Sequence, residues 1–337
     1  MKTKENTVTS IKSFLLDNAL IIALLVMILL IIVIEPAFLQ WRVFKDILTQ
    51  SSVKLIVALG LLFALLLGGT DLSGGRQVGL AAVVVASLSQ IATYSNRFYP
   101  DLPQLPVIIP IAIAISIVAI IGLLNGLMIT RLKMAPFIAT FGMATIVLGI
   151  NSLYFAKEPN RSQPIGGISE KLTFLSSYKV FGEISLLVII ALLITAIVWF
   201  VLNKTVFGRN IYIVGGNSEA AEVSGLKVNR IITAAFVINS ILLGIAGVLE
   251  VARTGGANLS YGFSYEFDAI SACVVGGVSL SGGIGKVSGV IIGVIIFTII
   301  SYGLAFIGIN PNWQLIIKGL IICSAVALDM RKHAKAK

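Results

Sequence analysis

The stretch Gly68-Gly69-Thr70-Asp71-Leu72-Ser73-Gly74-Gly75 recurs 208 positions later as Gly276-Gly277-Val278-Ser279-Leu280-Ser281-Gly282-Gly283. Six of the eight positions match, and each copy follows one apolar run and precedes another. The chain therefore uses the same pair of apolar segments, joined by a glycine-rich break, twice. Interrupted helices at corresponding positions of two repeats are the best sequence indication of a substrate path through a membrane protein.

The composition predicts a membrane protein. Apolar residues make up 57% of the 337 residues and charged residues 12%, against about 25% charged residues in an average soluble domain. The predicted fold class is an all-α polytopic membrane protein, a single domain over 1–337 with about ten transmembrane helices, an internal repeat and glycine-broken helices. We expect the helices near 17–35, 53–69, 77–93, 106–130, 136–156, 184–202, 231–252, 268–281, 287–308 and 312–328.

The placement of the basic residues predicts an orientation. With the N-terminus in the cytoplasm, 15 of the 25 Lys and Arg residues fall on the inner side and 9 on the outer side, while Lys318 lies within a helical run. This excess predicts that both termini are cytoplasmic, with an N-terminal tail at 1–16 and a C-terminal tail at 329–337. The net charge of +10 lies in short loops and tails. We therefore expect membrane lipid, and no nucleic acid, as a partner.

The repeat also predicts a direction. It maps the second and third helices onto the eighth and ninth, an even offset of six helices. The two copies are therefore expected to run in the same direction, unless one of the glycine breaks is re-entrant.

The glycine motif has two interpretations. Residues 72–77 resemble the signature loop of ABC-type ATPases, but the chain contains no G-x-x-x-x-G-K-[ST] sequence and no segment for a soluble α/β domain. We therefore interpret the two copies as paired hinges or pathway elements near the cytoplasmic face. The residues assigned to them are Gly68, Gly69, Asp71, Ser73, Arg76, Gly276, Gly277, Ser281 and Gly282.

Asp71 is the position at which the two copies differ in charge, because Ser279 takes its place in the second. A carboxylate at a break inside a membrane marks a functional site by default. The alternative is a cap, in which Asp71 or Ser73 accepts from backbone N–H groups of the next helix. Arg76 could pair with Asp71 under either interpretation.

Two further groups of polar residues lie near the predicted outer side. Lys318 must extend its side chain to the membrane surface, pair with an opposite charge or face a water-filled path, because an unpaired charge at mid-membrane costs about 2.5–3.5 kcal/mol. Glu250, Glu266 and Asp268 are its possible partners. The segment 253–268 is typical of a site for a neutral hydroxylated solute, of a docking surface for a soluble binding protein, or of a plain external loop. Its polar and aromatic residues are Arg253, Asn258, Tyr261, Tyr265, Glu266 and Asp268.

The segment 203–230 predicts a cytoplasmic loop that contains a short capped helix. Asn217 or Ser218 can cap the helix, Glu219 suits its first turn, and Gly225 ends it. Such a helix between two membrane spans suits contact with another protein, although an ordinary amphipathic connector would have the same sequence features. The residues of this capped segment are Asn217, Ser218, Glu219, Ala220, Ala221, Glu222, Ser224 and Gly225.

Three separated blocks of the chain resemble the ribose/galactose-type permease subunits of bacterial ABC sugar importers, and the galactose/methyl-galactoside type most of all. The blocks are 69–73, 207–225 and 275–283, in the right order, and the likeness covers nearly the whole chain. The resemblance implies an architecture similar to that of vitamin-B12-type importers. It also implies transport of galactose, methyl galactoside or a related monosaccharide across the bacterial inner membrane.

The resemblance implies partners as well. They are a second copy of the chain, a periplasmic or lipid-anchored sugar-binding protein, and a cytoplasmic ATPase that binds ATP-Mg and docks on 217–225. The chain itself would then hold no cofactor or metal and would not be an enzyme. Two other function classes remain open. A stand-alone secondary sugar transporter would need ion-coupling groups, for which Lys318 and Glu250 are the candidates. An intramembrane enzyme would need a catalytic cluster, which the sequence does not offer.

Overall fold

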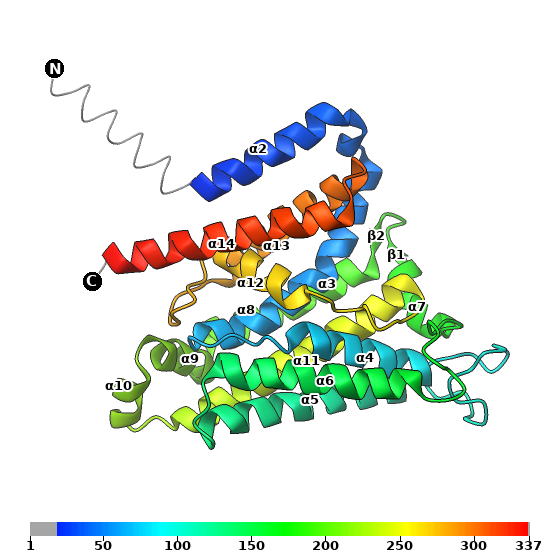
Figure 1. Ribbon diagram of the computed structural model, residues 1–337, viewed down its shortest axis with the longest axis horizontal. Helices are drawn as coiled ribbons and strands as arrows, with labels where there is room; N and C mark the ends of the chain where they lie inside the picture. Colours follow the sequence, from blue (N-terminus) through cyan, green and yellow to red (C-terminus); the bar gives the residue numbers. More distant parts are fainter. Residues whose placement is uncertain (1–18, 336–337) are drawn as a thin grey trace.

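The computed structural model describes residues 19–335, so the predicted N-terminal tail at 1–16 lies outside the described part. Most helices run along one common axis of the molecule (Figure 1). In chain order, the elements are α2 (Ala19–Ile34), η1 (Pro36–Leu39), α3 (Trp41–Leu66), α4 (Gly74–Leu88), α5 (Ile108–Thr130), α6 (Pro136–Ala156), α7 (Glu170–Ser177), β1 (Lys179–Val180), β2 (Ile184–Ser185), α8 (Leu186–Lys204), α9 (Val206–Gly216), α10 (Ser218–Val223), α11 (Val228–Thr254), α12 (Tyr265–Val275), α13 (Val287–Phe306) and α14 (Pro311–Lys335).

The described part of the chain is a polytopic all-α membrane protein. Six of its helices, namely α3, α5, α6, α8, α11 and α13, are long and apolar enough to cross a membrane, and α4 is apolar but shorter. Each of the ten expected runs overlaps one helix. The outer helices α6 and α8 expose large apolar side chains such as Leu153 and Leu193. Exposed apolar surfaces of this kind are typical of contact with lipid.

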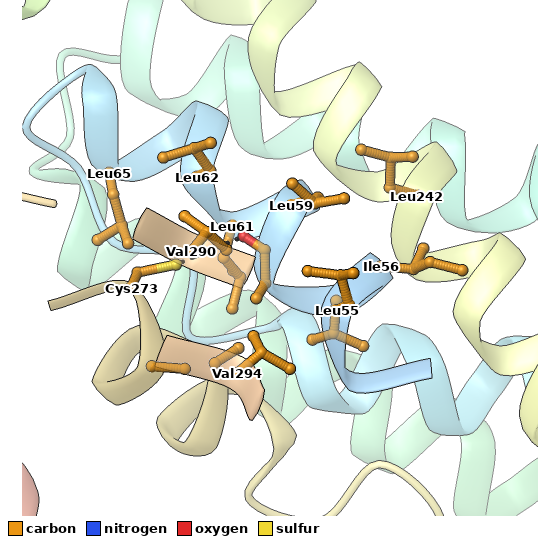
Figure 2. Close-up of a cluster of buried hydrophobic side chains, with 14 of the residues drawn as sticks. Leu55, Ile56, Leu59, Leu61, Leu62, Leu65, Leu242, Cys273, Val290 and Val294 are labelled. Carbon is orange, nitrogen blue, oxygen red and sulfur yellow. Dashed lines mark hydrogen bonds between the residues drawn. The ribbon is translucent and has the colours of Figure 1, made fainter. Parts of the chain in front are cut away.

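The core lies around the second half of α3. Every residue of this helix from Leu55 to Leu66 is buried, because apolar side chains point outward on all its faces and neighbouring helices cover each of them. In Figure 2, leucines of α3 point toward Leu242 of α11 on one side and toward Val290 and Val294 of α13 on another. Helix α3 is therefore the central element around which the other helices pack.

The two glycine breaks differ in geometry. Helix α4 begins at Gly74, so the last two glycines of the first copy are helical. The second copy is non-helical from Gly276 until α13 begins at Val287, and Gly282 adopts a φ of +88°. Glycine reaches that left-handed conformation without strain, so the chain turns there instead of continuing a helix. The prediction that the eighth helix continues to residue 281 is therefore wrong.

The first break folds back along α3. A Cβ at Gly74 would lie 3.3 Å from a methyl carbon of Leu61, five positions before the last residue of α3. At 1.5 Å per residue, α4 therefore begins roughly 8 Å inside the end of α3. It also begins three residues earlier than the predicted start at 77.

The helices that precede the two glycine motifs, α3 and α12, run in the same direction, as the even offset predicted. Asp268 of α12 lines one small cavity with Lys54 of α3. Further along both helices, the Sγ of Cys273 donates to the carbonyl oxygen of Ala58 over 3.5 Å. Helix α12 thus lies beside α3 and parallel to it.

Two boundaries differ from the prediction. Helix α3 begins at Trp41, 12 residues before the predicted start at 53. At the other end of the chain, α14 continues to Lys335 and includes most of the predicted tail at 329–337. Both boundaries were placed at the ends of the apolar runs, and the charged residues beyond those runs are helical too.

Candidate functional site

The two glycine motifs meet at one point, together with the end of α9. We call this point the glycine junction and define it by Leu66, Gly68, Gly215, Gly282 and Gly283. The backbone N–H of Gly283 donates to the carbonyl oxygen of Leu66 over 2.8 Å. A Cβ at Gly215 would overlap that same oxygen, and a Cβ at Gly282 would lie 2.7 Å from the backbone nitrogen of Gly68. Three backbones therefore touch with no side chain between them.

The predicted capped segment, residues 217–225, follows directly from this junction. The Oδ1 of Asn217 accepts from the backbone N–H of Ala220 over 2.9 Å, which caps α10 as predicted. Ala221 is buried and holds α10 to the rest of the molecule, while Glu219 and Glu222 are exposed. Val223 is 91% exposed, although it is apolar. The tip of α10 thus presents an acidic surface with an exposed valine.

Sequence reasoning missed α9, which lies between α8 and α10. Thr205 caps it, because its Oγ1 accepts from the backbone N–H of Gly208 over 3.1 Å. The signal was present as a threonine before an apolar run. The glycine pair Gly215 and Gly216 lies at the end of this helix instead of breaking it.

Asp71 is fully buried at the centre of a polar network. Its carboxylate accepts from the N–H of Ser73 over 2.9 Å, from the hydroxyl of Ser73 over 2.5 Å and from the Nδ2 of Asn239 over 2.6 Å. Gln77 donates to it from the first turns of α4 over 3.3 Å. Asn125 of α5 in turn donates to the Ser73 hydroxyl over 3.0 Å. The network therefore joins the first glycine break to α5 and α11.

The ion pairs of the described chain do not include the suggested pair between Asp71 and Arg76. Arg76 and Gln77 are neighbours in α4, so their side chains leave the helix about 100° apart. Gln77 faces Asp71, while the guanidinium of Arg76 lies 5.3 Å from the ring centroid of Phe263. Arg76 also lines a hollow of about 460 Å³ together with Glu266 of α12.

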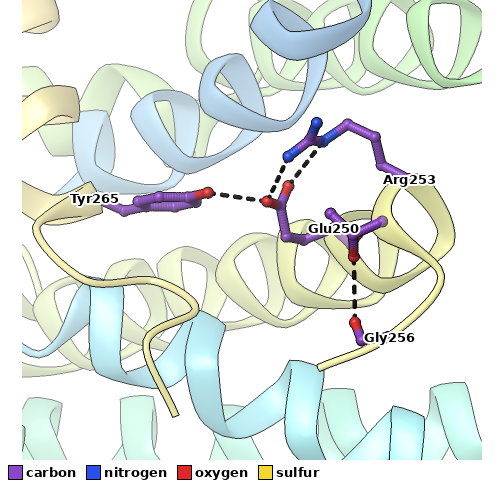
Figure 3. Close-up of polar contacts among 5 residues, drawn as sticks. Glu250, Arg253, Gly256 and Tyr265 are labelled. Carbon is purple, nitrogen blue, oxygen red and sulfur yellow. Dashed lines mark hydrogen bonds and ion pairs between the residues drawn. The ribbon is translucent and has the colours of Figure 1, made fainter. Parts of the chain in front are cut away.

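The predicted segment 253–268 divides into two parts. In Figure 3, Glu250 accepts from Arg253 at 2.7 Å and from the hydroxyl of Tyr265 at 3.0 Å. Lys318 pairs with Asp268 over 2.8 Å, so the structure selects one of its three possible partners. Arg253, Tyr265 and Asp268 are thus engaged in contacts within and between helices.

The rest of that segment lies against α4. Asn258 closes a local turn, because its Oδ1 accepts from the backbone N–H of Ser260 over 2.9 Å. A Cβ at Gly79 would overlap the carbonyl oxygen of Tyr261, and a Cβ at Gly75 would overlap the carboxylate of Glu266. The two glycines, four positions apart on α4, let this segment approach the helix backbone. That spacing was the available sequence signal for the contact.

Comparison with known proteins places the chain in a family. Residues 43–326 match the family model described as the permease component of the branched-chain amino acid transport system. The chain belongs to this permease family. The permease is 49% identical to the galactose/methyl galactoside import permease of Haemophilus influenzae over 331 residues, which cover 97% of this chain and 98% of the relative.

Other relatives agree with this placement. The galactose/methyl galactoside import permease of Escherichia coli is 46% identical, with 97% of this chain and 98% of the relative covered. The ribose import permease of Bacillus subtilis is 34% identical over 318 residues, with 93% and 92% covered. No solved structure matches the permease. The resemblance to ribose/galactose-type permeases is therefore confirmed.

Proposed function

We propose that the permease is the membrane-spanning subunit of an ATP-driven importer for galactose, methyl galactoside or a related monosaccharide. The observation that carries this proposal is the 49% identity, over nearly the full length of both chains, to a galactose/methyl galactoside import permease. The membrane helices fit this role, and the sequence lacks the phosphate-binding motif of an ATPase. In this proposal the permease is a non-catalytic single-domain subunit, and ATP-Mg binds to a separate ATPase.

The proposal includes an architecture. The permease works in the bacterial inner membrane as a pair of identical copies, each with about ten membrane helices arranged as in vitamin-B12-type importers. A periplasmic or lipid-anchored binding protein delivers the sugar from outside. The start of α2 and the end of α14 lie at the same end of the molecule as α10 (Figure 1), which supports cytoplasmic positions for both termini if α10 is cytoplasmic.

Reconstitution tests the function. The permease is placed in liposomes with a candidate ATPase and a candidate sugar-binding protein, and the uptake of labelled galactose is followed. We expect uptake that requires ATP and the binding protein. Uptake that needs no ATP and follows an ion gradient would contradict the proposal and favour a secondary transporter. The pairing of Lys318 with Asp268 and of Glu250 with Arg253 argues against that alternative, because these charges already neutralise one another.

Helix α10 is the proposed docking surface for the ATPase. Reversing its charge with Glu219→Lys and Glu222→Lys should reduce co-purification of the ATPase at least about fivefold, on the order of 1 kcal/mol, since charge complementarity steers such contacts. The matched control is Glu158→Lys, an exposed carboxylate in the loop between α6 and α7. Unchanged co-purification of the double variant would show that α10 is not the docking site.

A further inference from the structure

The hollow beside Arg76 lies between three elements that meet near the first glycine break. It has a volume of about 460 Å³, within the range of about 300–1,000 Å³ typical of small-molecule sites. Arg76 comes from the first turn of α4, and Glu266 from the first turn of α12. Phe137 and Phe141 of α6 stack on each other on the remaining wall, at 6.2 Å between ring centroids.

Glu266 places a buried carboxyl group beside this hollow. Its residue is 6% exposed, and its Oε2 has no hydrogen-bond partner among the described residues. A buried acceptor without a partner costs about 1–3 kcal/mol, and more when it is charged. The surrounding structure nevertheless keeps the carboxylate in place, because Gly75 leaves no side chain in its way. The Oε2 atom lies against Gly75 and is closed to solvent, so a ligand in the hollow would meet Glu266 through the rest of its side chain.

Arg76 complements Glu266 across the hollow. Between Gly74 and Ser87 of α4, Arg76 is the residue that is not buried. Neither Arg76 nor Glu266 takes part in an ion pair of the described chain. The hollow is therefore lined by the guanidinium of Arg76, with its five donors, and by the side chain of Glu266, and their opposite charges cancel. Lipid could satisfy neither group, and a charged ligand would leave one of them opposed by a like charge.

A neutral sugar fits all of these surfaces. Its hydroxyl groups can donate to Glu266 and accept from Arg76, and the apolar face of its ring can lie on Phe137 or Phe141. We propose that this hollow is a sugar-binding station on the path through the permease, which rests on the function proposed above. Leu72 of the first glycine break also lines the hollow. A movement of the break would therefore change the shape of the station.

Side-chain accessibility tests the station without measuring transport. Thr145 of α6 lines the hollow, and Ile150 of the same helix is exposed elsewhere. Thr145→Cys and Ile150→Cys are each made in a Cys323→Ser background, which leaves the buried Cys273 in place. The assembled complex is treated with a small water-soluble thiol reagent, with and without saturating galactose.

We expect the cysteine at 145 to react and galactose to slow its reaction several-fold, while mannitol and the cysteine at 150 show no such effect. A cysteine at 145 that does not react, or that reacts at the same rate with galactose, overturns the proposal if the same complex takes up galactose. If the complex takes up another sugar instead, the labelling is repeated with that sugar. In that case galactose is not the transported sugar, and the second labelling experiment tests whether the hollow binds the sugar that is transported.

Transport kinetics provide a second measurement. Glu266→Gln keeps the size of the side chain but removes the charged acceptor. We expect it to reduce galactose uptake about tenfold or more, while ATP hydrolysis stimulated by the binding protein stays within about twofold. Equal loss of uptake and hydrolysis would indicate a structural role for Glu266 and contradict a role in sugar binding.

Discussion

At the scale of single residues, Gly215 shows how little space the glycine junction leaves. A Cβ there would overlap the carbonyl oxygen of Leu66, whereas a Cβ at Gly216 would meet nothing within 4 Å. We therefore predict that Gly215→Ala lowers the stability by about 1–3 kcal/mol or more, as overpacking does. Gly216→Ala should change it by less than about 0.5 kcal/mol. Thermal unfolding of the purified variants in detergent measures both.

Equal melting temperatures for these two variants would show that α9 can move away from α3 at little cost. In that case the junction would be a loose contact and could not transmit movement from α10 to the glycine breaks. The comparison is informative because the two residues are adjacent, both lie in the last turn of α9, and both substitutions add a single methyl group.

Asp71 supports a second prediction at the same scale. Replacing it with alanine leaves the amide of Asn239 and the N–H and hydroxyl of Ser73 without their acceptor in a fully buried place. Each abandoned donor costs about 1–3 kcal/mol, so Asp71→Ala should destabilise the permease by several kcal/mol. Asn239→Ala, which removes one donor and keeps the carboxylate hydrogen-bonded to Ser73, should cost less. Unfolding in mixed micelles measures the difference, and an equal cost would contradict the central role of Asp71.

At the scale of elements, the ion pair between Lys318 and Asp268 joins α14 to α12. Both side chains are mostly buried, with 20% and 14% of their surface exposed. We predict that Lys318→Met and Asp268→Asn each destabilise the permease, and that the double variant loses less than the sum, by a coupling free energy of about 0.5–3 kcal/mol. A double-mutant cycle on unfolding free energies measures the coupling. Strict additivity would mean that Asp268 interacts chiefly with Lys54, which lines the same cavity.

The sequence predicted the ends of helices most accurately where a residue with a special backbone geometry, such as proline, marks the boundary. Helix α6 begins at Pro136, as predicted, because proline suits the first turn of a helix. The start of α3 was missed by 12 residues, since charged and polar residues interrupt the apolar pattern in its first turns. Tertiary contacts hold those turns: Lys45 donates to Glu183 over 2.6 Å, and this contact lowers the pKa of Glu183 below its usual range. A hydropathy pattern does not contain that long-range pair.

In the candidate sites, too, features set by local sequence were predicted and features set by long-range contacts were not. Residues 217–225 were predicted as a capped helix because capping is local and its sequence signal is strong. Asn125 and Asn239 were missed, since a single amide in an apolar run gives no sign of the partner it will meet. The separation of Arg76 from Asp71 could not be predicted either, because it depends on where α4 begins.

At the scale of the whole molecule, the proposed orientation predicts which surfaces face the cytoplasm. Ser224 is exposed beside the tip of α10, and Phe181 is 97% exposed in the hairpin between β1 and β2. In the proposed orientation, Phe181→Cys reacts with a membrane-impermeant maleimide in intact spheroplasts. Ser224→Cys reacts with the same reagent only after the spheroplast membrane is permeabilised. The reverse pattern would invert the topology and exclude α10 as a cytoplasmic docking surface.

The glycine junction also has a genetic consequence. When a substitution crowds a packed core, a smaller side chain nearby can restore the fit. Around Gly215 the crowding atoms belong to the backbone of Leu66 and Gly283, and no side chain there can be made smaller. A selection for regained growth on the transported sugar after Gly215→Ala should therefore recover true revertants, or changes that shift whole helices, and no compensating substitutions within the junction. A substitution at Gly215 can therefore disrupt the junction, and no second substitution within the junction can compensate for it.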